Sequence, residues 1–182
     1  MKPEPKKSIL ELSDNLFGKD YIDEAQLTIF LSDPNTKVIT EVSDEGNLMG
    51  FSIVRKLDWQ GLKSEFYEYP KQLEKHFNQD QIIGFRKSTG VSPQFQNQGL
   101  ASKMTLEGNQ WLEEKCDLLV SICWVKKGEP EFSKILRKDG FKELEKLQNV
   151  WYQESLDKNY QCGVCGQPPC NCEAIVYAKH IH

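Results

Sequence analysis

The sequence predicts a single α/β domain (α+β in some schemes), in which one mixed β-sheet carries helices on both faces. Segments with apolar residues at helical spacing alternate along the chain with short runs rich in β-branched residues. The 182 residues are 38% hydrophobic and 27% charged, which supplies one apolar core and excludes wholesale disorder. We therefore treat residues 1–182 as one domain.

The first part of the chain is predicted to form a helix, a β-hairpin and a long loop. Residues 13–31 carry apolar side chains near helical spacing. Residues 38–42 and 48–54 are rich in β-branched and apolar residues, and a turn sequence separates them, so we expect a hairpin. Residues 57–80 have no clear period and indicate a long loop with one helix near residues 71–77.

The middle of the chain is predicted to form a strand, a helix and a second strand. Residues 82–91 form the first of these. Residues 99–115 place Leu100 and Leu112 on one face of an amphipathic helix. Residues 118–125 are almost continuously apolar, which is typical of a central strand covered on both faces.

The last part of the chain is predicted to form a helix and two strands. Pro130 suits the first turn of a helix, and Gly140 suits its end. Residues 150–152 and 174–178 are expected to be the last two strands. The connection between them, residues 160–173, is a small cysteine-rich insertion.

Charge and hydropathy exclude several classes of function. The net charge of −4 argues against diffuse attraction to nucleic acid or anionic lipid. No apolar run approaches the length needed to span a bilayer. Residues 1–7 are charged and no apolar segment follows them, so no secretory signal is expected and we predict a cytoplasmic protein.

The segment most informative about function joins the strand at residues 82–91 to the next helix. Gly99 and Ala101 let the backbone approach a ligand closely, and the first N–H groups of the helix have no intrahelical partner. Together with the helix dipole, these groups suit a pyrophosphate. Because Pro93 has no N–H, we expect it to end strand pairing and open a gap for an extended ligand. The predicted binding residues are Val91, Ser92, Pro93, Gln96, Asn97, Gln98, Gly99, Leu100, Ala101, Ser102 and Lys103. A strand–turn–helix connection that binds nothing is the alternative.

This segment resembles the acyl-CoA-binding motif of the GNAT superfamily of N-acyltransferases. The match is the sequence Gln-Asn-Gln-Gly-Leu-Ala at residues 96–101, preceded by Val-Ser-Pro at residues 91–93. Residues 45–51 and 138–141 resemble other parts of the same family. The resemblance covers roughly residues 10–155 and implies a splayed sheet of about seven strands that opens where acetyl-CoA enters.

The resemblance also implies direct attack of an amine on the thioester. A backbone N–H near Val91 would stabilise the oxyanion, and a carboxylate would remove the amine proton. The candidate carboxylates are Glu41, Glu65, Glu68 and Asp80, and no spacing rule selects one of them.

The sequence departs from the family pattern where the departing thiolate would be protonated. Leu136 occupies the position at which many members carry a tyrosine. Gly128 and Glu129 lie where many members place an asparagine that contacts the pantetheine arm. The catalytic residues therefore stay unassigned at this stage.

A cluster of cysteines near the C-terminus predicts a metal site. Cys162, Cys165, Cys170 and Cys172 supply the thiolates that structural zinc prefers, and Cys162 to Cys165 resembles one knuckle of a zinc ribbon. His180 and His182 are substitute ligands. Disulfides, a redox switch or idle thiols are the competing interpretations. A zinc ion held by four thiolates would be structural, because no coordination position stays open for chemistry.

These observations predict an acetyl-CoA-dependent N-acetyltransferase that acts on an amine-bearing small molecule or peptide, as a monomer or homodimer. The alternative is a catalytically inactive, zinc-containing module of the same fold that binds a protein or nucleic acid. A third possibility keeps the enzyme but exchanges acetyl for a longer acyl group such as succinyl.

Overall fold

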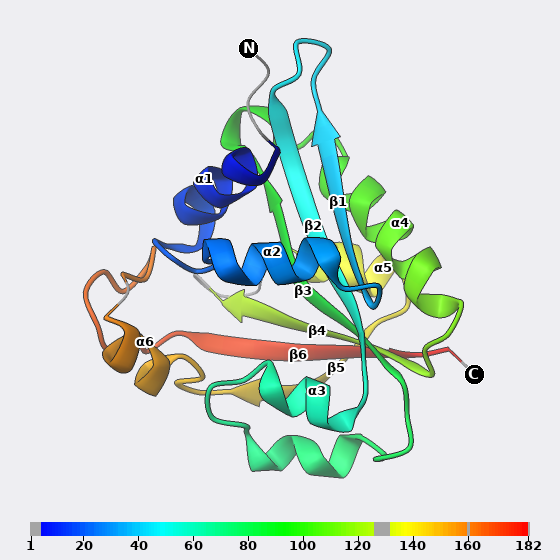
Figure 1. Cartoon of the computed structure of the whole chain (residues 1–182). Coiled ribbons are helices and arrows are strands. Elements are labelled where there is room, and N and C mark those ends of the chain that lie inside the picture. Colours follow the sequence, from blue (N-terminus) through cyan, green and yellow to red (C-terminus); the bar gives the residue numbers. More distant parts are fainter. Residues whose placement is uncertain (1–4, 126–131, 160, 182) are drawn as a thin grey trace.

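A computed structural model describes residues 5–125, 132–159 and 161–181 of the chain. Within these ranges, six strands form one mixed sheet in the order β1-β2-β3-β4-β6-β5 (Figure 1). The predicted α/β sheet with helices on both faces is confirmed, but it has six strands where the family resemblance implied about seven. The strands are β1 (Thr36–Val42), β2 (Leu48–Leu57), β3 (Ile83–Val91), β4 (Leu118–Val125), β5 (Lys142–Leu147) and β6 (Glu173–His180).

The sheet is antiparallel except at its centre. β1, β2 and β3 form an antiparallel meander, and β4, β6 and β5 form a second antiparallel set. The two sets meet where β3 and β4 pair in parallel. Because parallel neighbours need a crossover connection, helix α4 links these two strands.

Helices cover both faces of the sheet. Helix α4 packs across β1, β2 and β3 on one face, whereas α1, α2 and α3 pack on the other face of the same strands (Figure 1). No described helix combines the length and apolar character needed to cross a membrane. The α-helices are α1 (Pro5–Phe17), α2 (Glu24–Ser32), α3 (Trp59–Ser64), α4 (Leu100–Glu113), α5 (Ser133–Lys138) and α6 (Tyr152–Lys158), and the 3₁₀ helices are η1 (Lys71–His76) and η2 (Pro93–Phe95).

The helix predicted over residues 13–31 is wrong in its extent, because two helices occupy this region. The chain takes a left-handed turn at Gly18, where φ is 120°, and this interrupts the helical spacing. A capping box then starts α2, in which Asp23 accepts from the N–H of Gln26 and the Gln26 side chain accepts from the N–H of Asp23.

Five predicted strands are confirmed, and the strand predicted at residues 150–152 is wrong. This segment forms the turn into α6, and the missing strand is β5, at Lys142–Leu147. β5 lies at the edge of the sheet, and every one of its residues except Leu144 and Leu147 is Lys or Glu, so a search for apolar runs does not find it.

The structure also changes the predicted extent of the long loop and gives the end of the last predicted helix. The loop over residues 57–80 contains α3 as well as the expected helical turn, and its Trp59 and Leu62 are buried. The predicted helix start at Pro130 lies outside the described residues. Helix α5 ends as expected, because Gly140 follows it in the left-handed conformation with φ of 89°.

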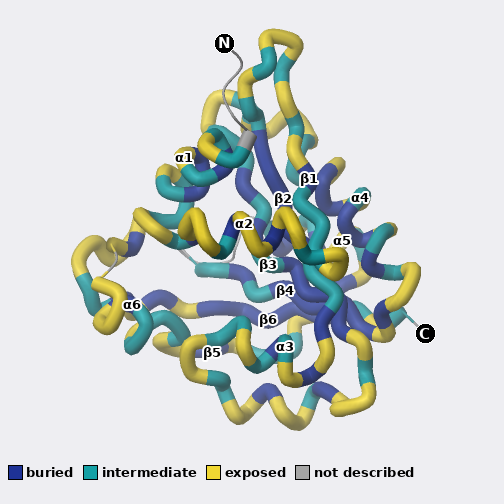
Figure 2. The backbone as a smooth tube through the Cα atoms, in the orientation of Figure 1, coloured by how far each residue is buried: buried dark blue, intermediate teal, exposed yellow. Residues whose placement is uncertain are grey.

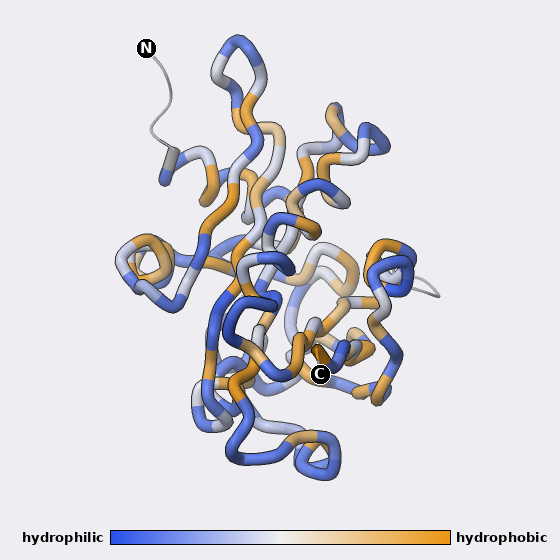
Figure 3. The backbone as a smooth tube through the Cα atoms, turned by 90° about the vertical axis from the view of Figure 1, so that its right-hand side faces the viewer, coloured by the Kyte–Doolittle hydropathy of each residue, from blue (hydrophilic) through white to orange (hydrophobic). Residues whose placement is uncertain are grey.

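The apolar core lies on both sides of the central strands. Most residues of β3, β4 and β6 are buried, whereas the outer loops are exposed (Figure 2). The helices carry both apolar and polar residues around their turns, as amphipathic helices do (Figure 3). This arrangement fixes β3 and β4 rigidly at the centre of the molecule, where the candidate site lies.

Candidate functional site

The two central strands separate halfway along their length. The last parallel pair joins Arg86 of β3 to Ser121 of β4. Beyond this pair β3 runs on to Val91 and β4 to Val125, with no further pairing between these described residues. The edges of both strands therefore have backbone groups that no neighbouring strand satisfies, which a ligand can use.

A β-bulge in β3 accounts for the separation. Arg86 pairs with Val54 and Ser88 pairs with Ile53, so Lys87 is an extra residue without a partner on β2. A bulge bends its strand and increases the local twist. The bulge directly follows the last pair between β3 and β4, so the bend carries the end of β3 away from β4.

Pro93 is not the cause of the separation, which corrects the prediction from the sequence. β3 stays paired with β2 up to its end, and the Ser92 N–H still donates to the Met49 carbonyl at 2.8 Å. Pro93 instead begins η2, the short turn that leads from β3 towards α4.

The connection between β3 and α4 exposes an uncapped helix N-terminus. Asn97 and Gly99 are left-handed, with φ of 61° and 81°, and the Gln96 side-chain amide braces the turn by donating to the Val91 carbonyl at 3.1 Å. Gly99 is the N-cap of α4 and has no side chain, so it offers no hydrogen bond to the first N–H groups. A Cβ at Gly99 would meet no atom within 4 Å, so the space above the helix start is open.

A buried arginine anchors α4 against β3. Arg86 donates to the Asn109 side-chain oxygen at 2.6 Å and to the Thr105 carbonyl at 3.4 Å, both on α4. Burial lowers the pKa of Arg86 to about 10, which the negative charge of Asp139 partly offsets, so the guanidinium stays charged at neutral pH. The network holds the middle of α4 against the sheet.

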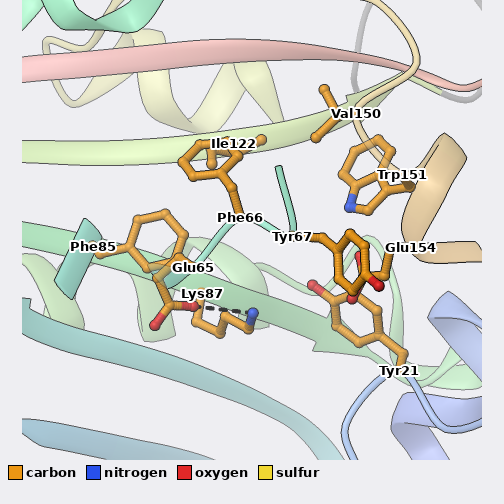
Figure 4. A pocket seen from close by; sticks show the side chains of 10 residues that line it. All are labelled: Tyr21, Glu65, Phe66, Tyr67, Phe85, Lys87, Ile122, Val150, Trp151 and Glu154. Carbon is orange, nitrogen blue, oxygen red and sulfur yellow. Dashed lines mark ion pairs between the residues drawn. The ribbon is translucent and has the colours of Figure 1, made fainter. Parts of the chain in front are cut away.

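A pocket lies on the opposite face of the sheet from α4. It encloses about 50 Å³ at the point where β3 and β4 separate (Figure 4). Its walls come from the α1–α2 turn, the segment after α3, β3, β4 and the start of α6. The lining residues are Tyr21, Glu65, Phe66, Tyr67, Phe85, Lys87, Ile122, Val150, Trp151 and Glu154.

An ion-pair network forms one wall of this pocket. The Lys87 ammonium lies 3.0 Å from one Glu65 oxygen, and Arg55 pairs with the other (Figure 4). Burial disfavours the charged form of Lys87, but its electrostatic interactions with Tyr21 and Glu65 outweigh burial, so the pKa of Lys87 lies above its ordinary value. Lys87 is therefore a cation at neutral pH and cannot accept a proton from the incoming amine.

A wider groove leads into the pocket from the surface. It holds about 420 Å³ between α2, the segment after α3, and α6. The residues that it shares with the pocket are Glu65, Phe66, Tyr67, Lys87 and Glu154. The Tyr67 hydroxyl donates to the Asp157 carboxylate on α6, which fixes the segment after α3 across the groove.

The structure separates the four carboxylates that the sequence offered as proton acceptors. Only Glu65 lines the pocket, and cations occupy both of its oxygens. Glu41 pairs with Lys103 near the start of α4, and Glu68 and Asp80 are exposed. No pattern in the sequence marks Tyr21, Lys87 or Glu154 as pocket residues, because their segments meet only in the fold.

The structure brings the four predicted zinc ligands together. Their sulfur atoms all lie within 4.8 Å of one another, with Cys172 at 3.6 Å from Cys162 and 3.4 Å from Cys165. A disulfide needs about 2.0 Å. Four sulfurs at about 2.3 Å from a central zinc lie about 3.8 Å apart in tetrahedral geometry. No disulfide joins these four cysteines, and their spacing fits a shared metal ion.

Backbone groups and burial act differently on these thiols. Burial disfavours ionisation of Cys162, but the N–H groups of Cys165 and Val164 each donate to its sulfur at 3.4 Å and bring its pKa below the ordinary value. Burial raises the pKa of Cys172 to about 11 and also raises that of Cys170. Cys162 is thus the thiol whose ionised form the protein stabilises most directly.

Leu136 and Trp124 pack into apolar clusters of the fold. Leu136, where many GNAT members carry a tyrosine, is fully buried in α5. Trp124, near the end of β4, packs against the buried cysteines.

No family model matches the chain, and no curated protein matches it either. Solved structures do match over nearly its whole length. NAA60 of Arabidopsis thaliana in complex with acetyl-CoA aligns with 100% of this chain and 96% of its own, with a TM-score of 0.72 and 9% identity. The ribosomal-protein-S18-alanine N-acetyltransferase of Escherichia coli aligns over 100% and 90%, with a TM-score of 0.63 and 13% identity. The NatC complex bound to Gag peptide and CoA aligns over 98% and 91%, with a TM-score of 0.64 and 14% identity.

These similarities agree with the arrangement of strands and helices described above. The identities are low, so the agreement concerns the architecture. The chain has the fold of the GNAT N-acetyltransferases.

Proposed function

We propose that this protein is an N-acetyltransferase that moves an acetyl group from acetyl-CoA to a primary amine by direct attack in a ternary complex. The observation that carries the proposal is the arrangement around the separated strands. An open helix N-terminus lies on the α4 face of the sheet, and a pocket lined by carboxylates and tyrosines lies on the other face. Two substrates approaching from the two faces would meet between β3 and β4.

The cofactor would bind at residues 91–103. The unpaired N–H groups at the start of α4 suit the pyrophosphate of acetyl-CoA, and the open space above Gly99 admits it. Solved proteins of this fold hold acetyl-CoA or CoA, which supports the same assignment. The pantetheine arm would then extend along the edge of β3 beyond Arg86, where backbone groups have no partner on β4.

The amine would enter through the groove and reach the pocket. Neighbours of this fold hold a bisubstrate analogue or a Gag peptide, so a peptide is one class of acceptor and a small amine is the other. We assign proton removal to Glu154 acting through water, because Lys158 pairs with only one of its oxygens, at 2.7 Å, whereas cations engage both oxygens of Glu65, the other carboxylate among the described lining residues. An N–H on the free edge of β3 would stabilise the oxyanion.

The test is binding followed by transfer. Titration calorimetry with acetyl-CoA is expected to give a Kd in the micromolar range, which corresponds to about −8 kcal/mol. Incubation with acetyl-CoA and a mixed set of peptides and small amines, read by mass spectrometry, is expected to add an acetyl group to a primary amine. Absence of acetyl-CoA binding would favour the noncatalytic binding module, and the buried Leu136, which offers no hydroxyl, is the observation on its side. Preference for succinyl-CoA over acetyl-CoA would instead change the acyl group.

We also propose that Cys162, Cys165, Cys170 and Cys172 hold one structural zinc ion. The converging sulfurs support this assignment, and a cytoplasmic, reducing setting would keep the thiols available. Metal analysis of the purified protein is expected to find one zinc per chain. Cys165→Ser should lower that content, whereas Cys116→Ser, a change at a cysteine outside the cluster, should not. Equal zinc in both variants would contradict the site.

A further inference from the structure

We propose that the metal held by the cysteine knuckle, residues 161–172, positions the wall of the acceptor pocket, so that metal occupancy sets the affinity for the acceptor and not for acetyl-CoA. The inference rests on the proposed transferase function. Three contacts carry it, and each joins the knuckle to a different wall of the pocket.

The first contact is with α6. The Cys170 N–H donates to the Ser155 hydroxyl at 2.8 Å, and both residues are buried. Ser155 is adjacent to Glu154, and Trp151 packs directly against the buried cysteines. Glu154 and Trp151 both line the pocket, so a shift of the knuckle moves this wall.

The second contact is with β4. Trp124 packs against Cys162, Cys170 and Cys172, and a Cβ at Gly163 would lie 3.5 Å from its ring. Trp124 lies two residues after Ile122, a lining residue, on the part of β4 that is no longer paired with β3. Lateral support for this end of β4 therefore comes from β6 and from the knuckle.

The third contact is with the α1–α2 turn. The backbone at Gly18 lies so close to Gln161 that an added Cβ would collide with the Gln161 carbonyl. The Tyr21 N–H donates to the Gly18 carbonyl at 3.2 Å, so the same turn places Tyr21 in the pocket. The knuckle thus touches a third segment that is far away in the sequence.

The knuckle has little secondary structure and little apolar core of its own. Its secondary structure is one isolated bridge, in which Cys162 and Gly166 exchange two hydrogen bonds of 2.9 Å. Its buried apolar surface is mainly that of its cysteines, and a segment this short cannot form a core by itself. A metal ion bound by the four sulfurs supplies the cross-link that keeps the three contacts in register. Residues 91–103 lie well away from the knuckle (Figure 1), so we expect metal binding to leave the acetyl-CoA affinity unchanged.

The test compares the full chain with and without zinc. Hydrogen exchange followed by mass spectrometry is expected to show lost protection in α6, the end of β4 and the α1–α2 turn after chelation, with residues 91–103 unchanged. The acetyl-CoA Kd should stay within about twofold, while KM for the acceptor found by the amine screen should rise by about 10- to 100-fold. Zn²⁺ added back should restore both readouts.

Two variants separate positioning from mere folding. Cys165→His keeps a zinc ligand at the exposed position of the cluster and should retain protection of α6. Ser155→Ala leaves all four thiols in place but removes the bond to the knuckle, so it should keep its zinc and still raise the acceptor KM. Exchange changes confined to residues 161–172, or equal losses of acceptor and acetyl-CoA affinity, would overturn the proposal. Absence of acetyl-CoA binding by the zinc-loaded protein would instead refute the transferase function, and the exchange experiment would still decide the positioning role.

Discussion

The two sides of the separated strands are built in opposite ways. The α4 side depends on one contiguous segment, residues 91–103, whose turn and helix start are specified locally by Asn97 and Gly99. The pocket side is assembled from five segments that lie up to 133 residues apart, from Tyr21 to Glu154 (154 − 21 = 133). A contiguous site can be recognised from a motif, whereas an assembled one depends on the whole fold and on what braces it.

The largest effect is expected from Gly99→Glu, a change in the contiguous segment at residues 91–103. A carboxylate at the start of α4 would repel the pyrophosphate and fill its space, and we expect the acetyl-CoA affinity to fall by about 100-fold, or about 2.8 kcal/mol. Calorimetry measures this loss.

Gly99→Asn is the matched control for this change, because asparagine tolerates the left-handed conformation and adds no charge. It should bind acetyl-CoA far better than the glutamate variant. Equal losses in the two variants would show that backbone strain, and not charge at a phosphate site, is responsible.

A smaller effect is expected from Glu65→Gln, a change in the pocket that several segments assemble. The change removes the carboxylate beside the buried Lys87 ammonium, and we expect the free energy of unfolding to fall by about 2 kcal/mol. Urea unfolding at pH 7 measures it, with the exposed neighbour Glu68→Gln as the control. If acetyl-CoA affinity fell in parallel with stability, the two sides would not be independent.

The smallest effect is expected from Tyr67→Phe. The hydroxyl donates to Asp157 across the groove, and this bond raises the pKa of Tyr67 above its ordinary value of about 10. Tyr67 therefore stays a donor as the pH rises towards that value, and the groove should keep its shape from pH 7 to pH 9. Loss of the hydroxyl should raise the acceptor KM by about two- to threefold without changing the acetyl-CoA Kd.

An unchanged acceptor KM in Tyr67→Phe at both pH 7 and pH 9 would mean that the segment after α3 does not shape the groove. If the acceptor KM of the wild-type protein were higher at pH 9 than at pH 7, this would contradict the raised pKa of Tyr67.

The sequence predicted the fold where a segment is apolar and local, and failed where its role depends on neighbours. β4 was found because it is apolar on both faces, and its predicted bounds match the structure. β5 was missed because an edge strand exposes its Lys and Glu residues, and the break at Gly18 was missed because apolar spacing continues on both sides of it.

The same distinction applies to the site. The spacing of the four cysteines was sufficient to predict that they converge. No spacing relates Tyr21 to Lys87 or Glu154, since they come from separate segments and share only the pocket. The segment at residues 57–80 carried one candidate that lines the pocket, Glu65, but its pairing with Lys87 and Arg55 depends on tertiary structure.

The bulge at Lys87 has a further consequence for how β3 presents its side chains. In a regular strand, residues of odd and even number face opposite ways. Here Lys87 lines the pocket and Ser88 bonds to the Tyr21 hydroxyl, so two consecutive residues face the same side, while Thr89 meets Ser52 and Arg86 on the other. The insertion thus reverses the parity of the strand at one position. It gives the acceptor face two adjoining polar groups without taking any from the α4 face.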